Sequence, residues 1–413
     1  MKKRILKGAA MGFTLALAIS SCSNQEEQFL DIENGKLETE ELIVSQSSQI
    51  IEGSYIIVFN QKVTGDMGAK YGNDHKAARL AVRSEAEKMF AENKVGSFEI
   101  SNSYSKVFNG VAAKLTSDEV SRLKSDNRIA YIEKDQMITL APPPGKGPGN
   151  GGGGTAAQET PWGITRVNGV TGYSGNGVAW IIDTGIDLDH PDLNVDASRG
   201  FNAFTSGKDG QSFDDGNGHG SHVAGTIAAI NNDIGVIGVA PGATVIPVKV
   251  LGSRGSGSYS GVIAGIEHVA ANGGNGDVAN MSLGGPISQA VDDAVFAAQS
   301  SEVKFVLAAG NESDDANNHS PARVNGNNVY TISAMNSNND GWASFSNFGN
   351  PPIDYCAPGV SIKSTWKDGG YNTISGTSMA APHAAGVLLL GSARASGTVN
   401  GDPDGEPDTI ISH

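Results

Sequence analysis

The chain has 413 residues and a formal net charge of −15. That length exceeds what one hydrophobic core usually supports, so more than one domain is expected. The acidic balance argues against a nucleic-acid partner, because phosphate binding needs a basic surface. Of the two cysteines, Cys22 falls in a targeting segment, which excludes a disulfide framework and leaves Cys356 as a small buried thiol without a chemical role.

The N-terminal segment is predicted to be an export signal. Four basic residues lie within positions 2–7, and the apolar run from Ala9 to Ile19 that follows them is too short for a permanent bilayer span. Two alternatives remain for residues 1–22. Either they form a plain secretory signal peptide, or residues 19–22 resemble a bacterial lipobox in which Cys22 is lipidated. Both alternatives place the protein outside the cytoplasm, in the medium or at the outer cell surface.

Residues 23–52 are polar and are predicted to form a flexible tether. Beyond them, residues 53–140 alternate between strand and helix patterns. A capping box at Thr116–Glu119 marks the start of the second helix. The order predicts a small open α/β sandwich, with elements at 55–59 (strand), 75–93 (helix), 107–115 (strand), 117–123 (helix) and 129–132 (strand).

A linker rich in proline and glycine covers residues 141–156 and offers a natural place for proteolysis. Residues 157–398 then alternate short apolar runs with helical segments, which predicts a mostly parallel sheet with helices on both faces. Residues 399–413 carry several carboxylates. They have some character of a calcium loop, but a solvated acidic tail is the favoured interpretation.

Three segments of the second domain carry residue types suited to catalysis. Asp183 ends an apolar strand, where active sites of open α/β sheets form. His219 stands between two glycines just before an apolar helix, and Ser378 opens a helix of small residues. Each alone has an ordinary structural explanation, such as a strand-end carboxylate or an N-cap serine.

His222 raises the alternative of a metal-binding histidine pair with His219. The spacing is i, i+3 with no glutamate between them, whereas a zinc protease motif places its histidines at i, i+4 around a glutamate. We therefore expect His222 to pack or cap, and we expect no zinc.

Taken together, the three segments follow the chain order Asp, His, Ser, which is the subtilisin order. Residues 183–187 (DTGID), 219–226 (HGSHVAGT) and 376–383 (GTSMAAPH) resemble the signature segments of the subtilase family, and connecting segments extend the resemblance over nearly all of 157–395. Residues 315–366 are most similar to the proteinase K branch. The resemblance implies a subtilisin-like catalytic domain, and it reinterprets residues 53–140 as an inhibitory propeptide.

The resemblance also implies site residues. Asp183, His219 and Ser378 would form the catalytic triad, and Asn311 would complete the oxyanion hole. The implied substrate-binding residues are Ser253, Gly255, Ser256, Gly257, Ser282, Leu283, Gly284, Ala308, Ala309 and Gly310. A structural Ca²⁺ would be held by Gln158, Asp192, Ile230, Asn232, Ile234 and Val236, with a second, weaker expectation at Asp354.

The function implied is that of an exported, self-processing serine endopeptidase, monomeric, acting on proteins through an acyl-enzyme with a broad preference for apolar or aromatic residues. A narrow processing protease of dibasic sites is the alternative, because Glu312, Asp314 and Asp315 closely follow Asn311. A pseudoprotease that only binds peptides is disfavoured, because no member of the catalytic set is missing.

Overall fold

The computed structural model describes residues 49–140, 157–391 and 393–413. The export signal with Cys22, most of the predicted tether and the linker 141–156 lie outside the described residues. Among the helices of these ranges, none combines the length and the apolar character of a membrane-spanning segment.

The first domain is an antiparallel sheet with the strand order β2-β3-β1-β4. The capping box that opens α4 is present as predicted. The prediction missed β2, and it was wrong to assign residues 49–52 to the tether, because β1 begins at Gln49. The elements are β1 Gln49–Phe59, α1 Gln61–Thr64, α2 Met67–Tyr71, α3 His75–Glu92, β2 Glu99–Tyr104, β3 Gly110–Lys114, α4 Ser117–Leu123 and β4 Ile129–Thr139.

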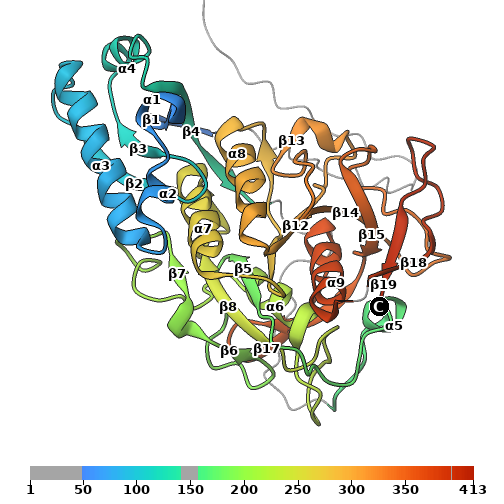
Figure 1. The fold of residues 1–413 in the computed structure, drawn as a ribbon. Helices are drawn as coiled ribbons and strands as arrows, with labels where there is room; N and C mark the ends of the chain where they lie inside the picture. The colour runs from blue at the N-terminus through green and yellow to red at the C-terminus, as the bar shows by residue number, and fades with distance from the viewer. Residues whose placement is uncertain (1–48, 141–156, 392) are drawn as a thin grey trace, which may run out of the picture. The chain divides into compact units, whose positions relative to one another are not determined.

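The second domain is built on a mostly parallel sheet, as the sequence predicts (Figure 1). Its strand order is β18-β19-β15-β14-β12-β10-β5-β8-β6. Its helices are α5 Trp162–Arg166, α6 His219–Ala228, α7 Tyr259–Asn272, α8 Gln289–Ala298 and α9 Thr377–Leu390. Its strands are β5 Ala179–Asp183, β6 Asn194–Val195, β7 Phe201–Asn202, β8 Thr244–Lys249, β9 Ser256–Ser258, β10 Val278–Met281, β11 Gly285–Pro286, β12 Lys304–Ala308, β13 His319–Ser320, β14 Val329–Met335, β15 Ile353–Pro358, β16 Ile362–Trp366, β17 Gly370–Ile374, β18 Arg394–Thr398 and β19 Thr409–Ser412.

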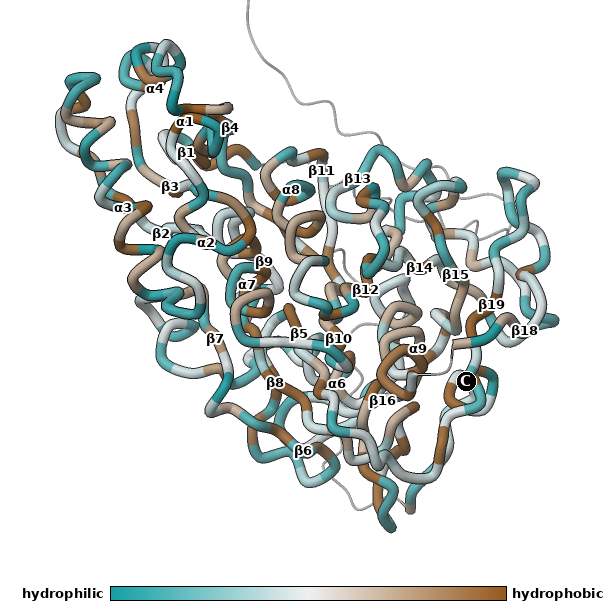
Figure 2. The backbone as a smooth tube through the Cα atoms, in the orientation of Figure 1, coloured by the Kyte–Doolittle hydropathy of each residue, from teal (hydrophilic) through white to brown (hydrophobic). Residues whose placement is uncertain are grey.

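Every residue of the interior strand β5 is buried, because helices cover both faces of this sheet. In β5, Trp180 and Ile182 pack toward α7 and α8, whereas Ala179 and Ile181 pack toward α6 and α9. The alternation follows from the two-residue period of a strand. Figure 2 shows apolar positions gathered on the interior strands of the sheet and on α9.

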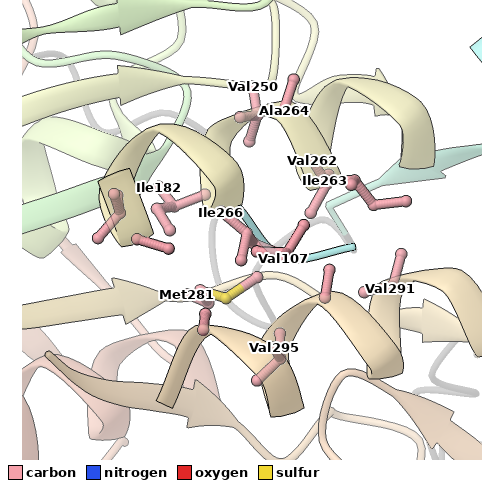
Figure 3. Close-up of a cluster of buried hydrophobic side chains, with 14 of the residues drawn as sticks. Val107, Ile182, Val250, Val262, Ile263, Ala264, Ile266, Met281, Val291 and Val295 are labelled. Atoms are coloured by element: carbon pink, nitrogen blue, oxygen red, sulfur yellow. The ribbon is translucent and has the colours of Figure 1, made fainter. Parts of the chain in front are cut away.

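The apolar core between the sheet and helices α7 and α8 also includes side chains from the first domain. Val107 packs beside α7 and α8 in the cluster drawn in Figure 3, and Ile56 and Ile138 belong to the same core. In addition, β4 pairs antiparallel with β9 of the second domain. The two domains therefore share one buried apolar core.

The C-terminal residues correct one prediction. The solvated tail expected for 399–413 is wrong, because β19 pairs with β15 and with β18 at the edge of the main sheet. Ile410 and Ile411 are fully buried there, and Asp408 is only 4% exposed, accepting a hydrogen bond from Ser333. Burial of these isoleucines against β15 outweighs the preference of the acidic segment for water.

Candidate active site

Strand order determines where the site forms. The chain moves from β5 to β8 on one side and then to β10 and β12 on the other, so the order reverses at β5. Ligands of open α/β sheets bind beyond the carboxyl ends of the strands at such a reversal. Asp183 ends β5, Ser282 follows β10, and Ala309 follows β12, so the predicted residues meet at one edge.

Asp183 and His219 form a hydrogen-bonded pair in the interior. Nδ1 of His219 lies 2.8 Å from Oδ1 and 2.9 Å from Oδ2 of Asp183, and the carboxylate is fully buried. The N–H of Thr184 also donates to Asp183 Oδ1. A carboxylate held in this way keeps the imidazole proton on Nδ1 and leaves Nε2 free to accept a proton.

The environment of His219 makes it a stronger base. Burial lowers the pKa of its imidazole, but the charge of Asp183, its hydrogen bond and the charge of Asp215 together outweigh burial. The net result is a pKa above the ordinary value of 6.5.

Asp215 is a second buried carboxylate at this site, and the sequence interpretation did not single it out. Its Oδ1 accepts hydrogen bonds from the N–H of Gly218 and the hydroxyl of Thr184, and its Oδ2 accepts from the N–H of Ser221. It thereby holds the turn before His219 against the end of β5. The run Asp214–Gly218 is rich in turn-forming residues, and this pattern could have indicated that Asp215 holds the turn before His219.

Lys249 is a buried cation beside these carboxylates, and it too was missed. It stands opposite Asp183 in the β5–β8 register, is 1% exposed, and donates to the carbonyl of Thr184. Burial lowers the pKa of its ammonium, while Asp215, Asp209 and Asp183 oppose that effect. An apolar strand ending in a lysine gives little hint of this, because most such lysines reach solvent.

Ser378 is the second residue of α9, which packs against α6, the helix that begins at His219. The helix has no side-chain cap, because its N-cap is Gly376. Within the described structure the Ser378 hydroxyl donates to the carbonyl of Ser282 at 3.2 Å rather than to His219.

Asn311 is fixed by the start of the same helix. Its Oδ1 accepts from the N–H and from the hydroxyl of Thr377, at 2.8 and 3.0 Å. A Cβ placed on Gly376 would lie 3.7 Å from both the Asn311 Nδ2 and the Ser378 nitrogen. The Asn311 amide and the Ser378 N–H therefore lie near the same glycine, and both residues line one pocket.

A pocket opens beside these donors. It is lined by residues that follow β10 and β12, including the predicted Ser282, Leu283, Gly284, Ala308, Ala309 and Gly310. Asn311, Ser378 and Leu140 border it as well. Several other lining residues, Glu312 and His319 among them, were not among the predicted substrate contacts.

Leu140 reaches this pocket because β4 pairs antiparallel with β9, the strand that contains the predicted substrate-binding residues Ser256 and Gly257. Ile138 stands opposite Gly257, Thr139 stands opposite Ser256, and the N–H of Leu140 donates to the carbonyl of Gly255. The predicted edge residues are thus paired with the first domain. Ser253 differs from them, since its N–H and hydroxyl both donate to Asp209 in the preceding loop.

Carboxylates from both domains hold the remainder of this contact. Glu267 of α7 accepts hydrogen bonds from the backbone N–H groups of Ser105, Lys106 and Val107. From the first domain, Asp135 of β4 accepts hydrogen bonds from the N–H and the hydroxyl of Ser260, which lies in the first turn of α7. Negative side chains are favourable at a helix N-terminus.

The predicted calcium ligands converge from three segments. Asn232 donates to Asp192 Oδ1 at 2.9 Å, and the N–H of Asn232 donates to Gln158 Oε1. The N–H of Val236 donates to Asp192 Oδ2, and the N–H of Ile230 donates to the Asp192 carbonyl. Asp192 is fully buried, and burial raises the pKa of its carboxyl. Here the carboxylate accepts hydrogen bonds from Asn232, Val236 and the Tyr371 hydroxyl. The side-chain oxygens of Asp192, Asn232 and Gln158 and the loop carbonyls are nevertheless the kind of oxygen ligands that a hard cation such as Ca²⁺ prefers.

The other predicted residues have ordinary surroundings. His222 Nε2 lies 3.0 Å from the carbonyl of Ile362, and burial lowers the pKa of its imidazole to about 3. Cys356 is a free, buried thiol whose pKa is raised by burial. Asp354 Oδ2 accepts the N–H of Thr331, and burial raises its pKa to about 6. Within the described ranges, no group of three or more His, Cys, Asp or Glu side chains is arranged to hold a metal.

The fold and this site define a serine peptidase of the subtilisin class, and comparison with known families agrees. Residues 176–400 match the Subtilase family, Peptidase_S8, and residues 54–141 match Peptidase inhibitor I9. The chain belongs to the subtilase family and carries an inhibitor I9 propeptide domain.

Relatives support the same assignment. Subtilisin NAT of Bacillus subtilis subsp. natto is 41% identical over 330 residues, which cover 78% of this chain and 79% of that protein. M-protease of Shouchella clausii (strain KSM-K16) is 43% identical over 286 residues, covering 68% of each chain. Alkaline serine exoprotease A of Vibrio alginolyticus is 41% identical over 306 residues, which cover 71% of this chain but only 53% of that protein.

Among solved structures, a cold adapted subtilisin-like serine proteinase is 40% identical and superimposes with a TM-score of 0.53. The match covers 60% of this chain and 96% of that one. The catalytic fold is therefore found nearly complete within this chain.

Proposed function

We propose that the protein is an exported, self-processing serine endopeptidase whose nucleophile is Ser378. The observation that carries the proposal is the buried Asp183–His219 pair at the carboxyl end of β5. In this reaction His219 Nε2 takes the Ser378 proton as Oγ attacks the peptide carbonyl, and then returns it to the leaving amine. Water hydrolyses the resulting acyl-enzyme by the same proton transfers in reverse.

The oxyanion formed during attack would be bound by the Asn311 amide and by the Ser378 N–H. Support comes from the shared space beside Gly376 that both nitrogens border. Ser378 must first turn its hydroxyl from the Ser282 carbonyl toward His219, a rotation about one side-chain bond.

The propeptide, which we assign to residues 49–140 because β1 begins at Gln49, would act as an intramolecular inhibitor. Its strand β4 pairs with the substrate edge at Ser256 and Gly257, so a substrate cannot occupy that edge at the same time. We place the maturation cut in the linker 141–156 and the catalytic domain after it, starting near residue 157. The domain then extends through β19, because this strand belongs to the main sheet.

For substrates, we propose broad endopeptidase activity with apolar or aromatic residues before the scissile bond. The pocket walls formed by Gly284, Ala309 and Gly310 leave room for such side chains. The processing-protease alternative is less favoured, because Glu312 and Asp314 are engaged by other side chains of the protein.

Two further features follow from the donor set and from the export signal. Ca²⁺ would be held by Gln158, Asp192 and Asn232 and by carbonyls of the 230–236 loop, where it would offset the buried Asp192 charge and stabilise the fold. The protein would act as a monomer outside the cytoplasm. Whether Cys22 carries a lipid would be read from the mass of the precursor's N-terminal peptide.

Self-processing tests the proposal directly. We expect the purified wild-type precursor to lose about 140–155 residues, whereas Ser378→Ala stays at full length, because removing the nucleophile abolishes the first step. The measurement is intact mass over time, with Ser313→Ala as a matched control on an exposed loop. A Ser378→Ala precursor that still matures in a clean preparation would exclude Ser378 as the nucleophile.

A further inference from the structure

Two acidic side chains meet at the contact between the propeptide and the catalytic domain, where strand β4 reaches the start of helix α8. Glu133 of β4 accepts the N–H of Ala290, in the first turn of this helix, on its Oε2 at 3.1 Å. Asp292 belongs to the same turn, and its side chain is only 14% exposed. One acid therefore comes from each side of the contact.

Each of these two acids has one oxygen that makes no hydrogen bond. Among the described residues, Glu133 Oε1 and Asp292 Oδ1 are buried and have no hydrogen-bond partner. The other oxygen of Asp292 lies 3.6 Å from Nε of Arg323, whose side chain is 38% exposed. A buried oxygen without a donor is costly while the carboxyl is charged, and a proton removes most of that cost.

The other ionisable groups around the pair are acids and phenols. Tyr131 and Asp135 lie two residues before and after Glu133, and so on the same face of β4. Tyr131 donates its hydroxyl proton to Asp293 of α8. Tyr259, the first residue of α7, is also close enough to feel the charges of the pair. Burial raises the pKa of both phenols, so they stay neutral, and the surroundings add negative charge to the pair.

We propose that Glu133 and Asp292 make the inhibitory contact sensitive to pH. A proton on the pair tightens the closed precursor, and release of that proton to solvent near neutral pH loosens it. The proposal rests on the proposed inhibition by the propeptide and adds its regulation. Strand pairing between β4 and β9 holds the propeptide in either state, so the pair changes the strength of the contact and not its position.

The direction of the effect follows from proton linkage. Burial, with smaller contributions from the charges of Asp293 and Glu133, raises the pKa of Asp292 from 3.8 to about 6. Burial also raises the pKa of Glu133. When the domains separate, Glu133 returns to water and the two charges part, so both pKa values fall. The closed precursor therefore holds more protons than the open one between about pH 4 and about pH 6, and closure weakens as pH rises through that range.

The test uses the full-length Ser378→Ala precursor, which cannot process itself. Strand β9 lies at the end of the propeptide sheet with β4 as its neighbour, so hydrogen exchange of the β9 amides reports separation of the domains. We expect their protection, corrected for the intrinsic exchange rate, to fall about tenfold between about pH 5 and about pH 7.5, since one unit of pKa difference corresponds to a factor of ten.

Three variants of this precursor isolate the pair. Asp292→Asn and Glu133→Gln should each reduce the fall in protection, and the double change should abolish it, because neither group can then ionise. Glu302→Gln is the matched control on an exposed residue and should follow the parent. In the active precursor at about pH 7.5, Asp292→Asn should also lengthen the lag before activity appears, because the contact stays in its tighter form.

Two results would overturn the role of the pair. One is protection that does not change with pH in the Ser378→Ala parent, and the other is a fall in the double variant as large as in that parent. If the double variant does not fold, Asp292→Asn alone decides, and a fall as steep as the parent's counts against the proposal. Failure of the peptidase function would appear differently, as a wild-type precursor no more active than Ser378→Ala, and would leave the exchange result unaffected.

Discussion

At the scale of single residues, the site consists of charged groups buried without bulk water. Asp183 is fully buried and Lys249 almost so, and Asp215 lies with them beneath His219. Each of these groups is tolerated in the interior because it is paired or hydrogen-bonded. His219 stands at the edge of this cluster, and its proton affinity therefore depends on the negative charges beside it.

This electrostatic setting predicts a pH dependence. Only neutral His219 accepts the Ser378 proton, so kcat/KM should rise with pH as the imidazole loses its proton. Because Asp183 and Asp215 outweigh burial and raise the His219 pKa, the midpoint of this rise should lie above 6.5. The measurement is kcat/KM for one peptide from about pH 5 to pH 9. A midpoint clearly below 6.5 would mean that burial dominates.

Asn311 gives a second prediction at this scale. Asn311→Leu removes one of the two donors beside Gly376 but leaves the Asp183–His219 pair intact. We expect kcat to fall by about 10²–10³ with little change in KM, because the lost hydrogen bond forms mainly in the transition state. Steady-state kinetics measures it. Equal losses in kcat and in substrate affinity would indicate instead that Asn311→Leu deforms the pocket.

At the scale of elements, the propeptide is held by strand pairing and by two carboxylates at α7. Strand β4 extends an antiparallel sheet through β9, and the N-terminus of α7 is met by Asp135. Glu267, further along α7, accepts three backbone N–H groups of the loop that follows β2. Inhibition should therefore be sensitive to this one glutamate.

We expect Glu267→Gln to weaken inhibition by roughly tenfold to a hundredfold, since hydrogen bonds to a charged group contribute about 1.5–3 kcal/mol. The full-length precursor should then show a shorter lag before activity appears. The measurement is the activation time course at fixed concentration, with the exposed Glu302→Gln as the matched control. An unchanged lag would show that strand pairing and apolar burial suffice.

At the scale of the whole molecule, the two domains share an apolar core, and the second domain contains the candidate calcium site. Asp192 there belongs to neither the triad nor the pocket, yet it connects the start of the domain, through Asn232 and Gln158, with the loop after α6. An ion at this position would stabilise the folded state by binding that state alone.

Removing the ion gives the corresponding prediction. Burial raises the Asp192 pKa, so ionised Asp192 destabilises the ion-free fold, and stability is lost as pH rises through that pKa. Bound Ca²⁺ cancels this loss. A chelator should therefore lower Tm of the Ser378→Ala precursor, more at about pH 8 than at about pH 5.

Asp192→Asn is the control for this experiment, because it removes the buried charge and should make Tm nearly insensitive to the chelator. Chelator effects of equal size in Asp192→Asn and in its parent would place the ion elsewhere. An absence of any chelator effect would show that the amide and carboxylate contacts are sufficient without an ion.

By itself, the sequence determined the features that depend on local pattern. Short apolar runs between helical segments predicted the parallel strands around β5, and the capping box predicted α4. The motifs around Asp183, His219 and Ser378 indicated the chemistry of the family. Such patterns can be interpreted without the tertiary structure, because they involve residues close together in the chain. The same local view failed for residues 399–413, where carboxylates suggested a solvated tail.

The tertiary structure alone decided which distant groups meet. It buried Asp408 and β19 against β15, brought Asp215 and Lys249 close to Asp183 and His219, and brought Glu312 and His319 into the wall of one pocket. These positions depend on strand order and on loops that cross the sheet edge, which no local pattern encodes. For that reason the sequence identified the reaction, whereas the fold decided the surroundings that tune it.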